Sequence, residues 1–134
     1  MYQLLIPDFK FSDDRGTLVQ LVHGGYTQVN VITTKQGVLR GNHYHKFSHE
    51  AFYIISGSVK VTLISNGKKQ ETLFQIGDFF EIPPMVLHEM FYPEDCIMVA
   101  LYDQPVENEQ GEKDICVPEI GDALWIVEEK DNYE

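Results

Sequence analysis

Short runs of strand-forming residues, separated by Gly, Pro, Asn and Asp, cover most of this chain. Such runs are typical of β-strands, and the spacing of an amphipathic helix is almost absent. Turns such as Ser56-Gly57 and Asn66-Gly67 can supply the positive φ that a tight connection between paired strands needs. We predict strands over residues 17–22, 28–34, 38–45, 50–56, 58–64, 69–74, 78–82, 87–91 and 96–102.

Many short antiparallel strands with regular turns predict a sandwich or a barrel. The chain of 134 residues has no internal repeat and no linker, so we expect one all-β domain over residues 1–134. The tail differs in character: 106–114 is polar and acidic, and 119–129 suits either a short helix or an edge strand. We expect residues 103–134 to form a C-terminal extension packed on the barrel. Six aromatic residues are expected in the core of the barrel: Phe47, Phe52, Tyr53, Phe79, Phe80 and Phe91.

The charge balance and the two cysteines narrow the classes of partner and compartment. With 21 acidic residues against 10 basic ones, a net charge of −11 argues against nucleic acid or an anionic membrane as partner. No apolar stretch approaches the roughly 18 residues that span a bilayer, and the apolar run ended by Pro7 is too short for a signal peptide. We therefore expect a cytoplasmic protein. Cys96 and Cys116 lack metal-site spacing and are expected to be free thiols, with Cys96 in a buried strand.

Three histidines and one glutamate form the strongest functional signal. His43 and His45 share one face of a predicted strand, and Glu50 can join them only if residues 46–49 form a bulge or turn that shifts the register. His88 follows a sharp turn at Pro83-Pro84 that can return its imidazole to the same cavity. Three imidazoles and one carboxylate suit Zn, Fe, Mn, Ni or Co without choosing among these divalent metals, and we expect Zn.

The spacing of these residues carries a family resemblance. His43-x-His45-x4-Glu50-x6-Gly57 and Gly77-x5-Pro83-x4-His88 resemble the two motifs of the cupin superfamily, except that Met85 stands where the second motif usually has Gly. The resemblance implies a small double-stranded β-helix, or jelly-roll barrel, with its site inside the mouth.

The N-terminal part resembles a narrower group. Asp14-Arg15-Gly16, residues 28–30 and residues 37–44 are similar to the dTDP-4-dehydrorhamnose 3,5-epimerase family, over about residues 8–102. Those epimerases have Gln where this chain has His45 and do not rely on a metal. The run 40–45 followed by Glu50 looks more like the C-terminal cupin domain of bifunctional capsule-precursor enzymes that bind zinc, and dTDP-sugar 3,4-ketoisomerases also carry a paired His-x-His. All three groups act on nucleotide-linked 4-keto-6-deoxy sugars.

These resemblances imply an epimerase or ketoisomerase acting on such a nucleotide sugar in surface polysaccharide biosynthesis, by proton abstraction next to the ketone. His43 would be the base and Tyr102 the acid, whereas in the metal reading His43 is a ligand and cannot also take the proton. Arg15, Arg40 and Asn42 are the candidate substrate-binding residues, because a charged fork or an amide beside the motif can bind a diphosphate or a carbonyl oxygen.

Two rival functions remain open from the sequence. One is a non-catalytic cupin that binds a metal and a sugar or small acid, and the other is a metal-dependent dioxygenase. In every reading we expect a homodimer, because open barrels of this type often cover an edge strand with a neighbour.

Overall fold

The computed structural model describes residues 1–119 as an all-β structure. Its strands run in chain order as follows: β1 (Gln3–Leu4), β2 (Phe9–Asp13), β3 (Gly16–Gln20), β4 (Gln28–Thr34), β5 (Leu39–His43), β6 (Glu50–Ser56), β7 (Ser58–Ser65), β8 (Lys68–Gln75), β9 (Phe79–Ile82), β10 (Leu87–Phe91) and β11 (Cys96–Tyr102). Among these residues there is no helix of the length and apolarity that a membrane crossing requires. Part of the segment 119–129, for which a helix or edge strand was expected, lies outside the described residues.

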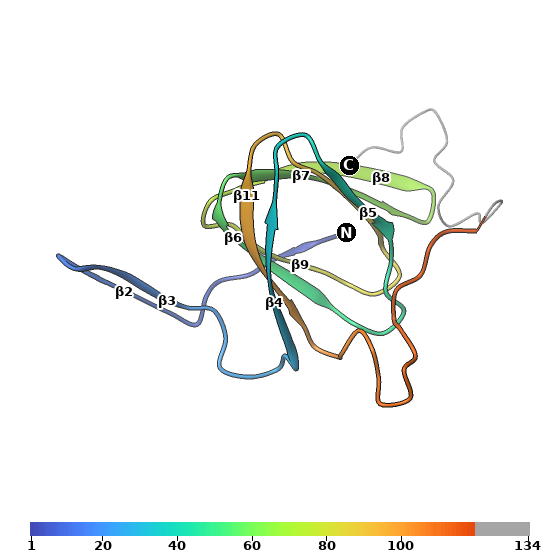
Figure 1. Ribbon diagram of the computed structural model, residues 1–134, viewed down its shortest axis with the longest axis horizontal. Coiled ribbons are helices and arrows are strands. Elements are labelled where there is room, and N and C mark those ends of the chain that lie inside the picture. Colours follow the sequence, from blue (N-terminus) through green and yellow to red (C-terminus); the bar gives the residue numbers. More distant parts are fainter. Residues whose placement is uncertain (120–134) are drawn as a thin grey trace.

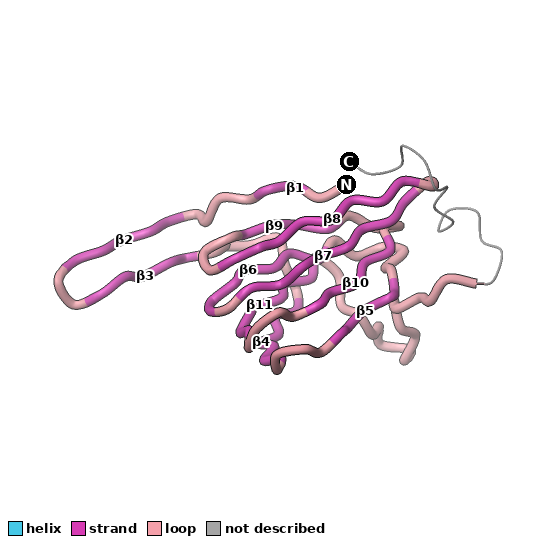
Figure 2. The backbone as a smooth tube through the Cα atoms, turned by 90° about the horizontal axis from the view of Figure 1, so that it is seen from above, coloured by secondary structure: helices cyan, strands magenta, loops and turns pink. Residues whose placement is uncertain are grey.

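Two antiparallel sheets enclose the core (Figure 1). One has the order β1-β9-β6-β11-β4 and the other β5-β10-β7-β8, while β2 and β3 form a separate hairpin. The hairpin projects well beyond the two sheets (Figure 2). The predicted fold class, an all-β jelly-roll barrel, is confirmed, and every predicted strand is present with small shifts at its ends. β1 and β2 were not predicted, because β1 is only 2 residues long and β2 has no buried face to give it a pattern.

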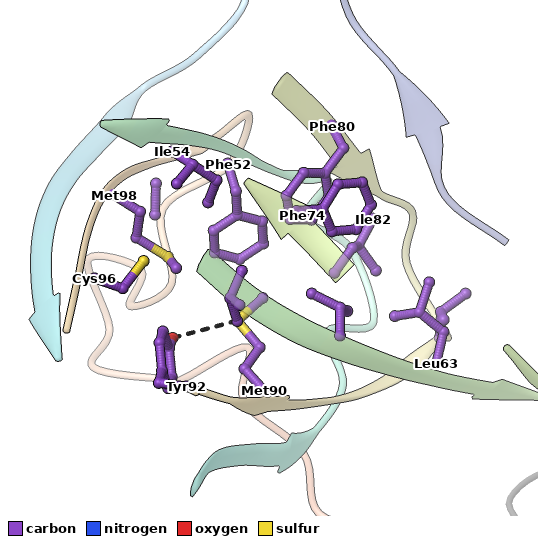
Figure 3. Packing of buried hydrophobic residues seen from close by; sticks show 14 of the residues in the cluster. Phe52, Ile54, Leu63, Phe74, Phe80, Ile82, Met90, Tyr92, Cys96 and Met98 are labelled. Carbon is purple, nitrogen blue, oxygen red and sulfur yellow. Dashed lines mark hydrogen bonds between the residues drawn. The ribbon is translucent and has the colours of Figure 1, made fainter. Parts of the chain in front are cut away.

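The core fills the space between the sheets (Figure 3). Phe74 stacks on Phe80 with ring centroids 3.7 Å apart, and Phe52 packs on the same ring at 5.3 Å. Aromatic stacking of this kind adds about 0.5–1.5 kcal/mol to the burial of each pair. Cys96 is buried at the start of β11, as expected.

Two of the aromatic residues expected in the core are exposed instead. Phe47 is 65% exposed because it lies in the loop between β5 and β6, outside the barrel. Phe91 is 41% exposed, since it follows the buried Met90 on β10 and alternate residues of a strand point to opposite faces. Phe52, Phe79 and Phe80 are buried, as predicted.

Gly57 joins β6 to β7 where no other residue fits. Its φ is +79°, and a Cβ atom there would lie 2.0 Å from the carbonyl oxygen of Asp95. The close approach brings the β6–β7 turn against the residue that precedes β11. The glycine of the first motif therefore has a packing role in this fold.

Candidate metal centre

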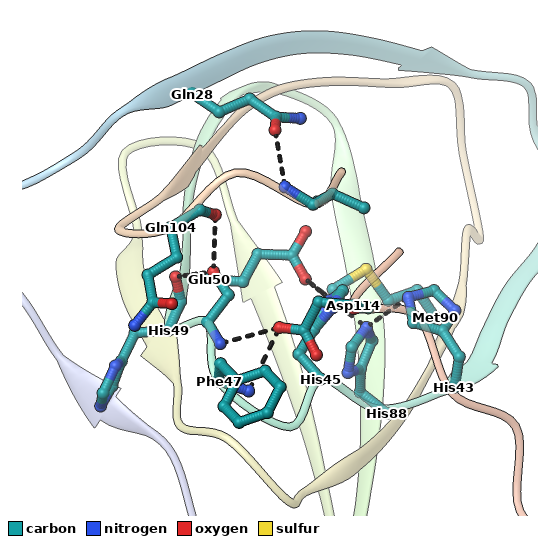
Figure 4. Close-up of polar contacts among 12 residues, drawn as sticks. Gln28, His43, His45, Phe47, His49, Glu50, His88, Met90, Gln104 and Asp114 are labelled. Carbon is teal, nitrogen blue, oxygen red and sulfur yellow. Dashed lines mark hydrogen bonds and ion pairs between the residues drawn. The ribbon is translucent and has the colours of Figure 1, made fainter. Parts of the chain in front are cut away.

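The structure brings His43, His45, Glu50 and His88 together at one end of the barrel interior (Figure 4). One ligand atom from each residue lies within 4.8 Å of the others. The Nε2 atoms of His43 and His88 are 3.1 Å apart, and Nε2 of His45 is 3.0 Å from Oε1 of Glu50. His45, Glu50 and His88 are buried, and His43 is half-buried.

Local irregularities in the chain produce this convergence. His43 ends β5 and pairs with His88 on β10, but Gly41 pairs with Glu89, so the extra residue Asn42 forms a β-bulge. Asn42 has φ 61° and Gly41 has φ 100°, and a Cβ on Gly41 would lie 2.7 Å from the carbonyl oxygen of His88. The bulge lets the two strands approach closely where both imidazoles point inward.

Residues 44–49 form the break between β5 and β6, which includes residues 46–49 where a break was predicted and begins two residues earlier because β5 ends at His43. Glu50 begins β6 and pairs with Tyr102 on β11, so it enters the site from the opposite sheet. The break is held by Asp103, whose carboxylate accepts hydrogen bonds from the backbone N–H of His49 at 2.7 Å and the hydroxyl of Ser48 at 3.3 Å. Nδ1 of His45 contacts the backbone carbonyl oxygen of Asp114.

The protonation states suit a cation site. Burial alone would raise the pKa of Glu50, but the hydrogen bond from His45 and the charge of His88 outweigh it and lower that pKa. Burial lowers the pKa of His88 to about 4 against the opposing charge of Glu50, and burial also lowers the pKa of His43. Burial opposes charge on His45 as well, but its hydrogen bond with Glu50 raises the pKa of this residue. Two neutral imidazoles therefore face one anionic carboxylate.

A cavity of about 460 Å³ adjoins His43, Glu50 and His88. The ionisable groups on its lining are His43, Glu50, His88, Arg40 and Tyr102, and the other lining side chains are mostly apolar: Ile32, Phe52, Met90, Tyr92 and Met98. Arg40 is held by a hydrogen bond from its Nε to Oγ1 of Thr34 at 3.0 Å. Burial and the charge of Glu50 raise the pKa of Tyr102, so its phenol stays protonated.

The other two predicted substrate-binding residues lie elsewhere. Arg15 is in the turn between β2 and β3, with 83% of its side chain exposed, and pairs with Asp13. Asn42 is exposed and shapes the bulge rather than the cavity wall. Asp103 and Asp114 were missed, because nothing in their sequence neighbourhood marks them out from the other acidic residues of the tail.

Comparison with solved structures places this fold among nucleotide-sugar enzymes. A mutant of the QdtA 3,4-ketoisomerase from Thermoanaerobacterium thermosaccharolyticum, in complex with TDP, aligns with a TM-score of 0.72 and 26% identity over 87% of each chain. A 3,4-ketoisomerase from Helicobacter canadensis aligns with a TM-score of 0.71 and 21% identity over 82% of this chain and 87% of the other. The dTDP-4-dehydrorhamnose 3,5-epimerase from Sulfolobus tokodaii aligns with a TM-score of 0.66 and 18% identity over 90% of this chain and 82% of the other.

The sequence comparisons identify the family. No curated protein sequence matches the chain. Residues 11–112, which include all four residues of the candidate metal centre, match the family described as the polysaccharide biosynthesis C-terminal domain. The chain belongs to this polysaccharide biosynthesis C-terminal domain family.

Proposed function

We propose that the protein is an epimerase or ketoisomerase acting on a nucleotide-linked 4-keto-6-deoxy sugar, in the synthesis of a surface polysaccharide. The observation that carries the proposal is the division of the cavity. His43, Glu50 and His88 cluster on its lining, and most of the other lining side chains, such as Ile32, Phe52 and Met98, are apolar. A 6-deoxy sugar has the same division, with a ketone and hydroxyl groups on one side and a methyl group on the other. The family and the QdtA 3,4-ketoisomerase likeness support the same substrate class.

The residues of the cavity suit proton transfer beside a ketone. His43 has a lowered pKa, so its imidazole is neutral near pH 7 and can accept a proton from the carbon next to the carbonyl group. Arg40 lines the same cavity and can donate hydrogen bonds to the oxygen on which charge develops. Tyr102 remains protonated and can return a proton to the sugar. Return of the proton to the other face of the same carbon gives an epimer, and return to a different atom gives a ketoisomer.

We also propose that a divalent metal, with zinc favoured, is held by His43, His45, Glu50 and His88. The donor set fits, since three imidazole nitrogens and one carboxylate oxygen cluster within one ion's reach. The fourfold set also fits iron, manganese, nickel or cobalt. A bound metal would supply Lewis acidity for the ketone oxygen.

The ligand role and the base role of His43 make opposite predictions for metal removal. If His43 is a ligand, treatment with a chelator should lower activity, and added zinc should restore it. If His43 is the base, the metal would occupy the lone pair that takes the proton, so a chelator should raise activity. Turnover measured before and after chelation, with total metal content determined in parallel, decides between the two roles.

The homodimer that we propose rests on surfaces that residues 1–119 leave uncovered. The β2–β3 hairpin projects from the barrel (Figure 1) with Phe9, Phe11 and Leu18 about half exposed, and a hairpin without support is at best marginally stable in water. On the edge strand β4, Val29 and Val31 are 61% and 69% exposed. A second copy could cover both. Light scattering should give twice the chain mass, and Phe11→Ser with Leu18→Ser should give the monomer.

Deuterium uptake from heavy water tests the activity directly. The purified protein is incubated with dTDP- and UDP-linked 4-keto-6-deoxyhexoses, and the sugars are analysed by mass spectrometry. Uptake that depends on the protein supports proton abstraction next to the ketone. No uptake from a folded, metal-loaded sample would contradict the proposal and favour a binding protein, and oxygen consumption with bound iron would favour a dioxygenase.

A further inference from the structure

The carboxylate of Asp114 holds three consecutive backbone N–H groups of the loop between β5 and β6, and Figure 4 draws its contact with Phe47. The donors are Lys46 at 2.7 Å, Phe47 at 3.2 Å and Ser48 at 2.9 Å. Asp114 is more than 60 residues away in sequence, with separations of 66 to 68. The loop lies between His45 and Glu50, so its conformation fixes the spacing of two of the four clustered residues.

The backbone of the same residue contacts the site itself. The carbonyl oxygen of Asp114 accepts the hydrogen bond of Nδ1 of His45, which leaves Nε2 directed at Glu50. Two residues later, Cys116 pairs with Tyr44 through two backbone hydrogen bonds of 2.9 Å. The segment 114–116 thus extends the sheet edge beyond β5 and carries the carbonyl group to the imidazole.

From this arrangement we infer that Asp114 is a positioning residue. Its carboxylate anchors the loop, and the anchored segment holds the ring of His45 so that Nδ1 donates to the carbonyl oxygen of Asp114 and Nε2 faces the cluster, where it donates to Glu50 and would ligate a metal only after losing that proton. A hydrogen bond on the distal nitrogen of a ligating histidine fixes both ring orientation and tautomer, and losing such a contact typically costs about 10- to 100-fold in metal affinity. The inference rests on the metal centre proposed above for its functional consequence, but the hydrogen bonding of the His45 ring can be measured without any metal.

The test compares the full chain with Asp114→Asn and Asp114→Ala. Asn keeps the shape of the side chain and one acceptor oxygen, so the Asp114→Asn variant can be measured if the Ala variant fails to fold. Glu109→Ala is the matched control, because it removes one negative charge from the exposed part of the same segment. Zinc affinity is measured with Zn²⁺ in competition with a chromogenic chelator, and the ¹⁵N shifts of the His45 ring are measured in metal-free protein.

We expect Asp114→Ala to bind zinc about 10- to 100-fold more weakly, with Asp114→Asn between it and the unaltered chain, and with changed His45 ring shifts in both. Glu109→Ala should match the unaltered chain. Zinc affinity and ring shifts that both stay unchanged would overturn the inference. So would weaker zinc binding with unchanged ring shifts, since a purely structural role would give that result. If the unaltered chain binds no zinc, the metal proposal fails, and the ring shifts alone decide the role of Asp114.

Discussion

The backbone N–H of Met85 donates a hydrogen bond of 2.7 Å to the carbonyl oxygen of His45. Met85 makes this contact with φ 64°, in the left-handed region that side chains other than Gly rarely adopt. It stands where the second cupin motif usually has Gly, so the strained conformation is retained although the residue that relieves it is absent. The contact ties the turn before β10 to a residue of the candidate metal centre.

Replacing Met85 with Gly should relieve the strain. Met85 is 39% exposed, so Met85→Gly and Met85→Ala lose the same part of its packing beyond Cβ, and we expect Met85→Gly to have a free energy of unfolding about 0.5–1 kcal/mol above that of Met85→Ala. Met85→Ala also removes the side chain beyond Cβ but keeps the strained backbone conformation, so it should not raise the free energy of unfolding. Urea unfolding of metal-free protein measures both variants, and equal stabilities for Gly and Ala would show that φ is not the source of strain.

Gly57 and Gly77 allow a comparison of how much a nearby backbone atom adds to the cost of replacing a glycine. Both have positive φ, but a Cβ on Gly57 would meet the carbonyl oxygen of Asp95 at 2.0 Å, whereas a Cβ on Gly77 would meet nothing within 4 Å. We expect Gly77→Ala to cost about 1 kcal/mol and Gly57→Ala to cost more than about 3 kcal/mol. Thermal unfolding of the two variants gives the comparison, and similar losses would mean that the β6–β7 turn can move away from Asp95.

The candidate metal centre could be predicted because part of its geometry follows from local rules. Strand alternation predicted His43 and His45 on one face, and the structure brings both to the cluster although β5 ends at His43; the odd spacing to Glu50 demands a break, which the structure has at residues 44–49. Asp103 and Asp114 could not be predicted in the same way. They act through backbone donors far away in sequence, and Glu107, Glu109 and Glu112 in the same tail offer the same chemistry. Arg15 was expected at the site from its motif, yet the hairpin carries it away from the barrel of its own chain (Figure 2).

Metal binding should stabilise the fold. A metal that binds only the folded chain adds about 2.7 kcal/mol to the free energy of unfolding at a free concentration of about 100 times Kd. His45→Gln should remove most of this gain, since Gln lacks the imidazole nitrogen that faces Glu50. His23→Gln is the control, because His23 is exposed and pairs only with Asp8 among the contacts of the described residues. Melting curves with zinc and with a chelator test the prediction, and an undiminished zinc effect in His45→Gln would count against His45 as a ligand.

Tyr102→Phe should separate catalysis from stability. Tyr102 is 7% exposed and lines the cavity, and burial together with the charge of Glu50 raises the pKa of its phenol, so its hydroxyl can return a proton to the substrate. Loss of a positioned proton donor typically slows turnover by about 10²- to 10⁴-fold. Tyr26→Phe is the matched control, since Tyr26 donates a 2.8 Å hydrogen bond to Glu81 outside the cavity. Both variants should lose about 1 kcal/mol of stability, but only Tyr102→Phe should slow product formation. If deuterium uptake persists in Tyr102→Phe while product formation stops, the phenol is the acid of the second step. If both continue at the original rate, Tyr102 has no part in proton transfer.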